Sequence, residues 1–327
     1  MNKPIFILGC TKSGTTLMRN LFDGHPSLFV IPTEAHFFQN SKYWVDYYFR
    51  RTKPENLSFD EIKQNLIHWI TYQNSIKNTI ADGFSKNRWN IELLEESIQN
   101  VQINSMRELS DLYVRSMYKS LMAENIPNGI RFVEKSVENT ELALDWLNLY
   151  PDAYYIHILR NPYSNIVAIR KYLNTKKFPD LSPALYALKN TYYNMYKNIR
   201  LIKKMKIVIY EDLISNPLEI MKEISDFASI EFNKAILTPT LFGKTWGGNS
   251  TSGKKFDKIS NTNLNLWKES ITDFEIMLIN KYFQNVLQDF NFEIITPKKS
   301  IYYPNKHESL KSYCKNRILF KTYPELK

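Results

Sequence analysis

The sequence is poor in cysteine and lacks both a long apolar run and a metal-binding motif. Among its 327 residues there are two cysteines, Cys10 and Cys314, too few for a disulfide framework. No stretch reaches the roughly 18 uninterrupted apolar residues that cross a membrane, and the first apolar run ends in a loop motif, with no cleavage site. Neither HExxH nor CxxC occurs, so no metal is expected. Together these absences predict a cytoplasmic protein.

The chain has fewer acidic than basic residues. The chain has 43 Lys and Arg against 33 Asp and Glu, a net charge of +10, which favours an anionic partner. Residues 296–327 contain eight basic residues and two Glu, so most of the surplus lies there. We interpret this segment as a solvated basic tail, with contact to an anionic surface as the alternative. Nucleic acid is not expected as a partner, because no nucleic-acid-binding module is recognisable.

Short apolar strands alternate with helical patterns over most of the chain. Strands are predicted at residues 4–9, 28–32, 130–135, 153–160 and 206–210. Helices are predicted at 14–25, 140–150 and 164–173. This alternation predicts a three-layer α/β fold with a central parallel sheet flanked by helices. Residues 41–128 are aromatic, charged and helix-patterned with almost no strand signal, which indicates a helical, substrate-binding insertion in a domain spanning 1–295.

Polar residues follow the predicted strands, where ligands bind in parallel sheets. The strand ends lead into Gly9, Lys135, Arg160 and Tyr210. Because a buried guanidinium needs a partner, Arg160 after an apolar strand is better explained as a ligand-binding residue than as core. His157, inside the same strand, is expected to be a hydrogen-bonded core histidine.

The stretch GCTKSGTTLM, residues 9–18, looks like a phosphate-binding loop with a displaced lysine. Gly9 and Gly14 keep the spacing of the Walker loop G-x-x-x-x-G-K-[ST], but Thr15 replaces the lysine and Lys12 lies inside the loop. The backbone amides of residues 13–16 can hold one phosphate. One 5′-phosphate bearing a further group therefore fits better than a triphosphate with magnesium. A nucleoside or small-molecule kinase that uses ATP and magnesium is the alternative, and a purely structural turn is a third reading.

Three separated motifs resemble the sulfotransferases that use 3′-phosphoadenosine 5′-phosphosulfate. They are GCTKSGTTLMRNLFDGHPSL, FVEKSVENTELALDWLNLYPDAYYIHILRNP and IVIYEDLISNP. The likeness is closest to the bacterial and tyrosylprotein branch and runs from about residue 4 to residue 292. It implies a P-loop-like fold, this donor, 3′,5′-adenosine bisphosphate as product, and no metal.

The resemblance also implies roles for individual residues. The 5′-phosphosulfate would be bound by Lys12, Ser13, Gly14, Thr15 and Thr16. Lys12 and Lys135 would lie near the transferred sulfuryl group and act in catalysis. Arg160 would pair with the 3′-phosphate, and Tyr210 would contact the nucleotide.

Other positions match the family less closely. Glu34, in IPTEAHFF, falls about where the branch carries its catalytic glutamate, one residue further from the loop, and His36 is the alternative base. Where the family usually has a serine eight residues after the strand-ending arginine, this chain has Ala168, and Ser164 is the candidate replacement. The segment WGGNSTSGKKFDKISNTNLNLW resembles the late loop that covers the nucleotide. Its candidate contacts are Ser250, Lys258 and Ser260.

The implied reaction moves a sulfuryl group from the donor to an acceptor hydroxyl. A carbohydrate or glycan precursor is the first choice of acceptor, because the aromatic residues of the helical block could stack on a sugar ring. A tyrosylprotein or a small alcohol is the alternative acceptor. The alternative that is not an enzyme is a carbohydrate- or membrane-binding module that uses the basic tail.

Overall fold

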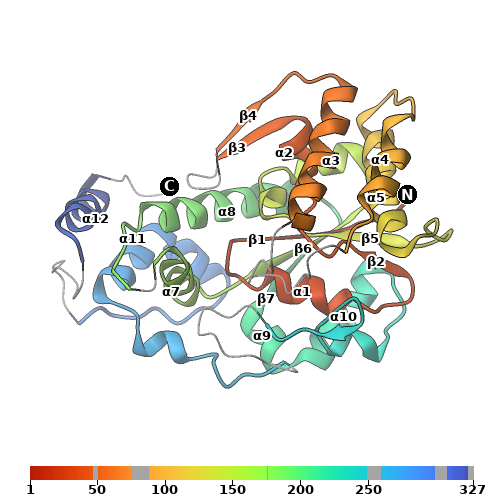
Figure 1. The fold of residues 1–327 in the computed structure, drawn as a ribbon. Helices are drawn as coiled ribbons and strands as arrows, with labels where there is room; N and C mark the ends of the chain where they lie inside the picture. Colours follow the sequence, from red (N-terminus) through yellow and green to blue (C-terminus); the bar gives the residue numbers. More distant parts are fainter. Residues whose placement is uncertain (47–50, 76–87, 175, 249–258, 299–307, 323–327) are drawn as a thin grey trace.

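A five-stranded parallel sheet forms the centre of the protein (Figure 1). The computed structural model describes residues 1–46, 51–75, 88–174, 176–248, 259–298 and 308–322. The strands lie in the order β2 (Leu28–Val30), β5 (Arg131–Glu134), β1 (Ile5–Gly9), β6 (Tyr154–Leu159) and β7 (Met205–Ile209). Each predicted apolar run forms one of these strands, which confirms the predicted fold class.

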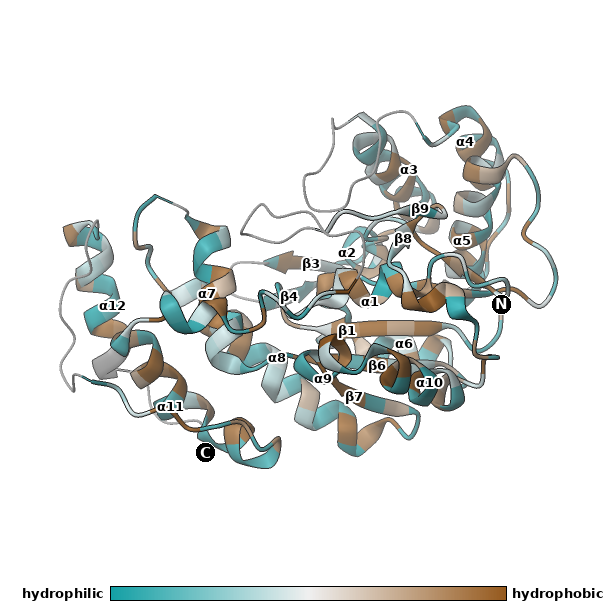
Figure 2. Ribbon diagram, turned by 90° about the horizontal axis from the view of Figure 1, so that it is seen from below, coloured by the Kyte–Doolittle hydropathy of each residue, from teal (hydrophilic) through white to brown (hydrophobic). Residues whose placement is uncertain are grey.

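The parallel pairing brings the predicted strand ends to one edge of the sheet. β1 pairs with β5 on one side and β6 on the other, and β6 pairs with β7. Gly9 ends β1, while Lys135, Arg160 and Tyr210 directly follow β5, β6 and β7. β1 is buried along its whole length, as expected of a strand covered on both faces, and Figure 2 shows it as a largely hydrophobic strand.

Helices cover both faces of the sheet. One face packs against α1 (Thr15–Phe22), α9 (Tyr210–Ser215) and α10 (Pro217–Ala228). The other face packs against α6 (Ala143–Leu149) and α8 (Ser182–Leu201). α7 (Pro162–Leu173) and α11 (Asp273–Asp289) lie together beside α8 in a second apolar cluster. The result is the expected three-layer arrangement.

The described residues of the block 41–128 include three helices and one hairpin. The helices are α3 (Phe59–Ser75), α4 (Ile91–Gln99) and α5 (Met106–Met122), and the short α2 (Phe37–Ser41) precedes them. β3 (Tyr43–Asp46) pairs with β4 (Arg51–Pro54) in an antiparallel hairpin, which the sequence of this block does not signal. The residues of β4 are all exposed and polar or proline, and so give no alternating apolar signal.

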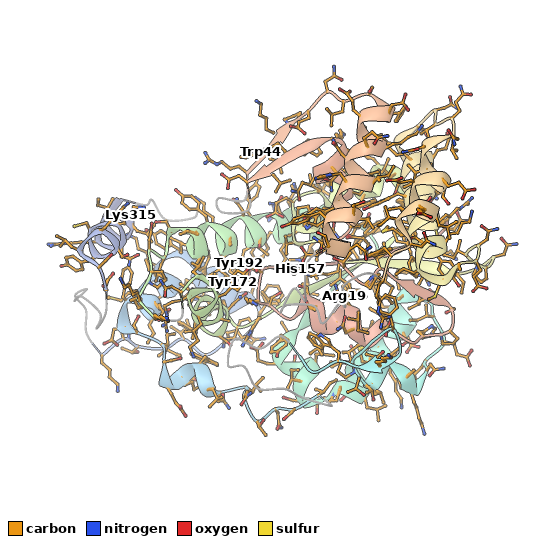
Figure 3. The ribbon with its side chains drawn as sticks, in the orientation of Figure 1. Arg19, Trp44, His157, Tyr172, Tyr192 and Lys315 are labelled. Carbon is orange, nitrogen blue, oxygen red and sulfur yellow. The ribbon has the colours of Figure 1, made fainter. Side chains whose placement is uncertain are left out.

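The basic C-terminal segment includes a docked helix, α12 (Leu310–Thr322). The buried Asn316 side chain accepts a hydrogen bond from the backbone N–H of Leu181 (2.8 Å) and donates one to the carbonyl oxygen of Pro179 (3.0 Å). Leu319 is also buried. The expected solvated tail is therefore partly a packed helix, with Lys315 on its surface (Figure 3).

The remaining described elements are short. They are η1 (Val137–Thr140), η2 (Lys234–Leu237), η3 (Leu266–Glu269) and the strands β8 (Thr240–Leu241) and β9 (Lys244–Thr245). Within the described ranges, no helix combines the length and the apolar character needed to cross a membrane.

Candidate functional site

Two glycines shape the loop between β1 and α1. Gly9 and Gly14 have φ angles of +144° and +107°. A Cβ atom on Gly14 would lie 2.7 Å from Cε2 of Tyr210, and one on Gly9 would lie 2.7 Å from the carbonyl oxygen of Ile158. Both positions therefore require glycine. α1 begins directly after Gly14, so its first N–H groups are free of intrahelical partners and can stabilise an anion held by the loop.

The side chains of the loop fit a bound phosphate. The hydroxyl of Ser13 is buried, 1% exposed for the residue, and has no hydrogen-bond partner among the described residues. Thr15 and Thr16 are also buried at the start of α1. The Nζ of Lys12 lies 4.4 Å from the ring centroid of Tyr172, a residue of α7 that Figure 3 labels. An orphaned hydroxyl beside a helix N-terminus is what a phosphate oxygen would satisfy.

Arg160 joins the loop to the neighbouring strand ends. Its Nη1 donates to the carbonyl oxygen of Lys12 and its Nε to Oγ of Ser164, both at 2.9 Å. The guanidinium carbon lies 4.8 Å from the ring centroid of Tyr210. Nη2 makes no hydrogen bond to any described residue. Ser164 therefore lies beside Arg160, whereas Ala168, one helical turn further along α7, is buried and apolar.

The second cluster forms where β5 ends, and it joins Glu34, His36 and Lys135. The Nζ of Lys135 donates to Oε1 of Glu34. The Nε2 of His36 lies 3.1 Å from Oε2 of Glu34, and its Nδ1 lies 2.8 Å from Oε1 of Glu138. His36 and Lys135 are buried, while the side chain of Glu34 is 20% exposed. The two candidate bases are thus in direct contact.

Charges in this cluster shift the pKa values of both candidates. Burial raises the pKa of the Glu34 carboxyl, but the charge of Lys135 and the contact with His36 outweigh it and hold this pKa well below its usual range. Burial lowers the pKa of His36, but the charges and hydrogen bonds of Glu138 and Glu34 raise it to about 10. Glu34 is therefore ionised at neutral pH, and His36 is protonated.

The sequence reasoning missed Glu134, Ser136 and Glu138, which hold the segment around Glu34. Oε1 of Glu134 accepts from the backbone N–H of Ala35 (3.2 Å), and Oγ of Ser136 accepts from that of His36 (3.0 Å). Burial and the charge of Glu138 raise the pKa of Glu134 to about 7, against hydrogen bonds from its neighbours. A carboxylate that ends an otherwise apolar strand was the available signal for Glu134.

Some predicted residues lie elsewhere. Ser250 and Lys258 fall outside the described residues. Ser260 makes a 2.9 Å hydrogen bond to the hydroxyl of Thr262, and nothing described joins it to the loop. Tyr172, the partner of Lys12, was also missed, because an exposed tyrosine near a helix end carries no local signal. In the described parts of the chain, no three His, Cys, Asp or Glu side chains are grouped to hold a metal ion.

A glycine-shaped loop after β1, with basic residues at the adjacent strand ends, is the arrangement of a P-loop-like fold. The sulfotransferase family model matches residues 4–234, and the chain belongs to the sulfotransferase family. The family resemblance is thereby confirmed, and with it the assignment as a transferase.

Two solved structures of sulfotransferase domains share the fold. The domain from the curacin biosynthetic pathway aligns with a TM-score of 0.56 and 19% identity, over 90% of this chain and 99% of that one. The domain from the Synechococcus PCC 7002 olefin synthase aligns with a TM-score of 0.53 and 17% identity, over 99% and 98% of the two chains. At these identities the likeness concerns the fold. No curated protein matches the chain.

Proposed function

We propose that the protein transfers a sulfuryl group from 3′-phosphoadenosine 5′-phosphosulfate to an acceptor hydroxyl. The observation that carries this proposal is the 2.9 Å hydrogen bond from Arg160 to the backbone of Lys12. It places a guanidinium with an unused N–H group against a loop suited to one phosphate. A nucleotide with single phosphates at both the 5′ and the 3′ position matches this pair of sites.

The residues divide between holding the donor and stabilising charge. The N–H of Ser13 donates to the carbonyl oxygen of Cys10 (3.1 Å), so the amides of residues 14–16 and the hydroxyls of Ser13, Thr15 and Thr16 would hold the 5′-phosphate. Arg160 with Ser164 would hold the 3′-phosphate. The donor supplies an activated sulfuryl group: an acceptor O–S bond forms while the S–O bond to the 5′-phosphate breaks. Lys12 and Lys135 are the cations that would neutralise the oxygens of this group.

Glu34 is the proposed general base, a role typically worth about 10²- to 10⁴-fold in rate. It would take the proton of the acceptor hydroxyl. Its ionised state and its 20% exposed side chain support this role. His36 is protonated in the same cluster and has no free lone pair with which to accept a proton.

The acceptor is proposed to be a carbohydrate or glycan precursor, with a tyrosyl or small-alcohol hydroxyl as the alternative. Exposed aromatic rings support the first choice. Trp44 lies on the β3–β4 hairpin and Tyr172 on α7 next to Lys12, and both are more than half exposed (Figure 3). Such rings can stack on the apolar face of a sugar.

Calorimetry with 3′,5′-adenosine bisphosphate, 5′-AMP and ATP with magnesium tests the donor. We expect the bisphosphate to bind most tightly, and stronger binding of ATP with magnesium would favour the kinase alternative. Arg160→Ala should weaken the bisphosphate by about 10- to 150-fold, the value of a charged hydrogen bond, and 5′-AMP much less. Arg51→Ala, at an exposed ion pair on the hairpin, is the matched control. Equal losses for both nucleotides would contradict the 3′-phosphate role.

A further inference from the structure

Both ring nitrogens of His36 face carboxylate oxygens. Nδ1 lies 2.8 Å from Oε1 of Glu138, and Nε2 lies 3.1 Å from Oε2 of Glu34. A neutral imidazole carries one N–H group, so it can donate to one of these carboxylates and would present a lone pair to the other. Donation to both carboxylates requires the imidazolium form.

The described contacts of His36 also favour the charged form. Lys135 contacts the other oxygen of Glu34, and the side chain of Glu138 is 2% exposed. Two carboxylates thus meet two cations, Lys135 and protonated His36. A neutral His36 would remove one positive charge from contact with these two carboxylates, which is costly in a site of low polarity.

The further described contacts of His36 come from uncharged residues. The ring of Trp69 packs against His36 with centroids 4.7 Å apart. Ser136 accepts the backbone N–H of His36, and Glu134 reaches the cluster through the backbone N–H of Ala35. Glu138 is therefore the carboxylate behind His36, on the side away from Glu34.

We propose that Glu138 is a positioning residue that keeps His36 positively charged, so that His36 orients the Glu34 carboxylate and does not itself accept the proton of the acceptor. This inference rests on the proposed role of Glu34 as base. Glu138 acts through His36 and has no contact of its own with Glu34 in the cluster. The charge and hydrogen bond of Glu138 are the largest effects that raise the pKa of His36.

Glu138→Gln tests the proposal because it keeps the shape of the side chain and removes its charge. Nuclear magnetic resonance of the imidazole groups measures the charge of His36 directly, and His36→Gln identifies its signals among those of the five histidines. In the wild type we expect His36 to stay protonated from pH 5.5 to 8.5. In Glu138→Gln we expect its titration midpoint to fall below pH 8. Glu223→Gln, in a surface ion pair with Lys206, is the matched control and should leave the midpoint unchanged.

The pH dependence of kcat/KM tests the consequence for catalysis. Glu138→Gln should add an ionisation with the midpoint seen for His36, above which kcat/KM falls by about five- to tenfold, the difference between a charged and a neutral hydrogen bond. Glu138→Asp, which keeps the charge, should lack this ionisation, and so should the double variant Glu138→Gln/His36→Gln. A merely structural role of Glu138 would lower activity equally at every pH.

The outcomes separate this inference from the proposed function. A wild-type His36 midpoint below pH 8, or a midpoint that Glu138→Gln does not move, overturns the inference, and the wild-type titration decides even if the variant does not fold. An active Glu138→Gln enzyme with the wild-type pH profile also overturns it. A wild type in which His36 is charged but no sulfuryl transfer occurs would refute the proposed function and the positioning role, and leave the charge state established.

Discussion

Gly14→Ala should damage both the fold and the nucleotide site. The substitution meets two separate obstacles. At a φ of +107° any side chain is strained, at a cost of about 1–2 kcal/mol. The new Cβ would also lie 2.7 Å from Cε2 of Tyr210, and overpacking of this kind costs about 1–3 kcal/mol more. Because Tyr210 stacks on Arg160, its displacement disturbs both proposed phosphate sites.

Gly129→Ala separates the two costs. Gly129 has a φ of +85°, and a Cβ there would meet nothing within 4 Å. We expect Gly129→Ala to lower the free energy of unfolding by about 1–2 kcal/mol and to leave nucleotide affinity unchanged. Gly14→Ala should lower it by about 2–5 kcal/mol and weaken 3′,5′-adenosine bisphosphate by at least about tenfold, which is 1.4 kcal/mol. Urea unfolding and calorimetry measure the two quantities.

The contact with Tyr210 can be tested by a double-mutant cycle. In a Tyr210→Ala background the Cβ of Gly14→Ala has no ring to meet, so its stability cost should fall to that of Gly129→Ala. An unchanged cost in that background would refute the clash with Tyr210. Wild-type affinity of Gly14→Ala for the bisphosphate would refute the assignment of the loop as the 5′-phosphate site.

Three further predictions concern single side chains. Glu34→Gln should reduce turnover by about 10²- to 10⁴-fold while calorimetry shows unchanged affinity for the bisphosphate; retained activity would exclude Glu34 as the base. Burial lowers the pKa of His157 to about 3 from the usual 6.5. Below pH 6.5 this histidine therefore binds a proton in the unfolded chain but not in the folded one, which lowers the stability of the fold. The wild type should therefore lose about 1.5 kcal/mol more stability than His157→Leu between pH 6.5 and 5 in urea unfolding, and equal losses would contradict the assignment. Asn316→Ala leaves the buried N–H of Leu181 without its partner and should lower the free energy of unfolding by about 1–3 kcal/mol. The control Lys315→Ala removes an exposed ion pair and should lower it by less than about 1 kcal/mol. Similar costs for the two variants would mean that α12 is not held by Asn316.

The central sheet could be predicted because parallel strands buried on both faces are short apolar runs. The same logic placed Lys135 and Arg160 at one edge of the sheet. The β3–β4 hairpin and α12 escaped prediction for a physical reason. β4 is exposed throughout, and α12 is held by a buried asparagine and a few apolar contacts, so neither has a periodic apolar face. Their stability comes from tertiary contacts that local patterns do not encode.

The candidate functional site was likewise only partly predictable from the sequence. The residue types at the strand ends were predictable, but the partners that tune them were not. Glu138 contacts His36 across 102 positions of sequence, and nothing local marks it. His157 is buried as predicted, but the expectation that it is hydrogen-bonded is wrong, because neither ring nitrogen has a partner among the described residues.

A carboxylate flanked by two cations is ionised but is a weak base, so Glu34 must lose one of these contacts before it can take a proton effectively. His36 is held on its far side by Glu138, whereas Lys135 has Glu34 as its one described hydrogen-bond partner. The negative sulfuryl group is the charge that would draw Lys135 away. The acid limb of kcat, which reflects the complex, should therefore lie at higher pH than that of kcat/KM, which reflects the free enzyme. Coincident limbs in pH–rate profiles would mean that Lys135 stays on Glu34 throughout the reaction.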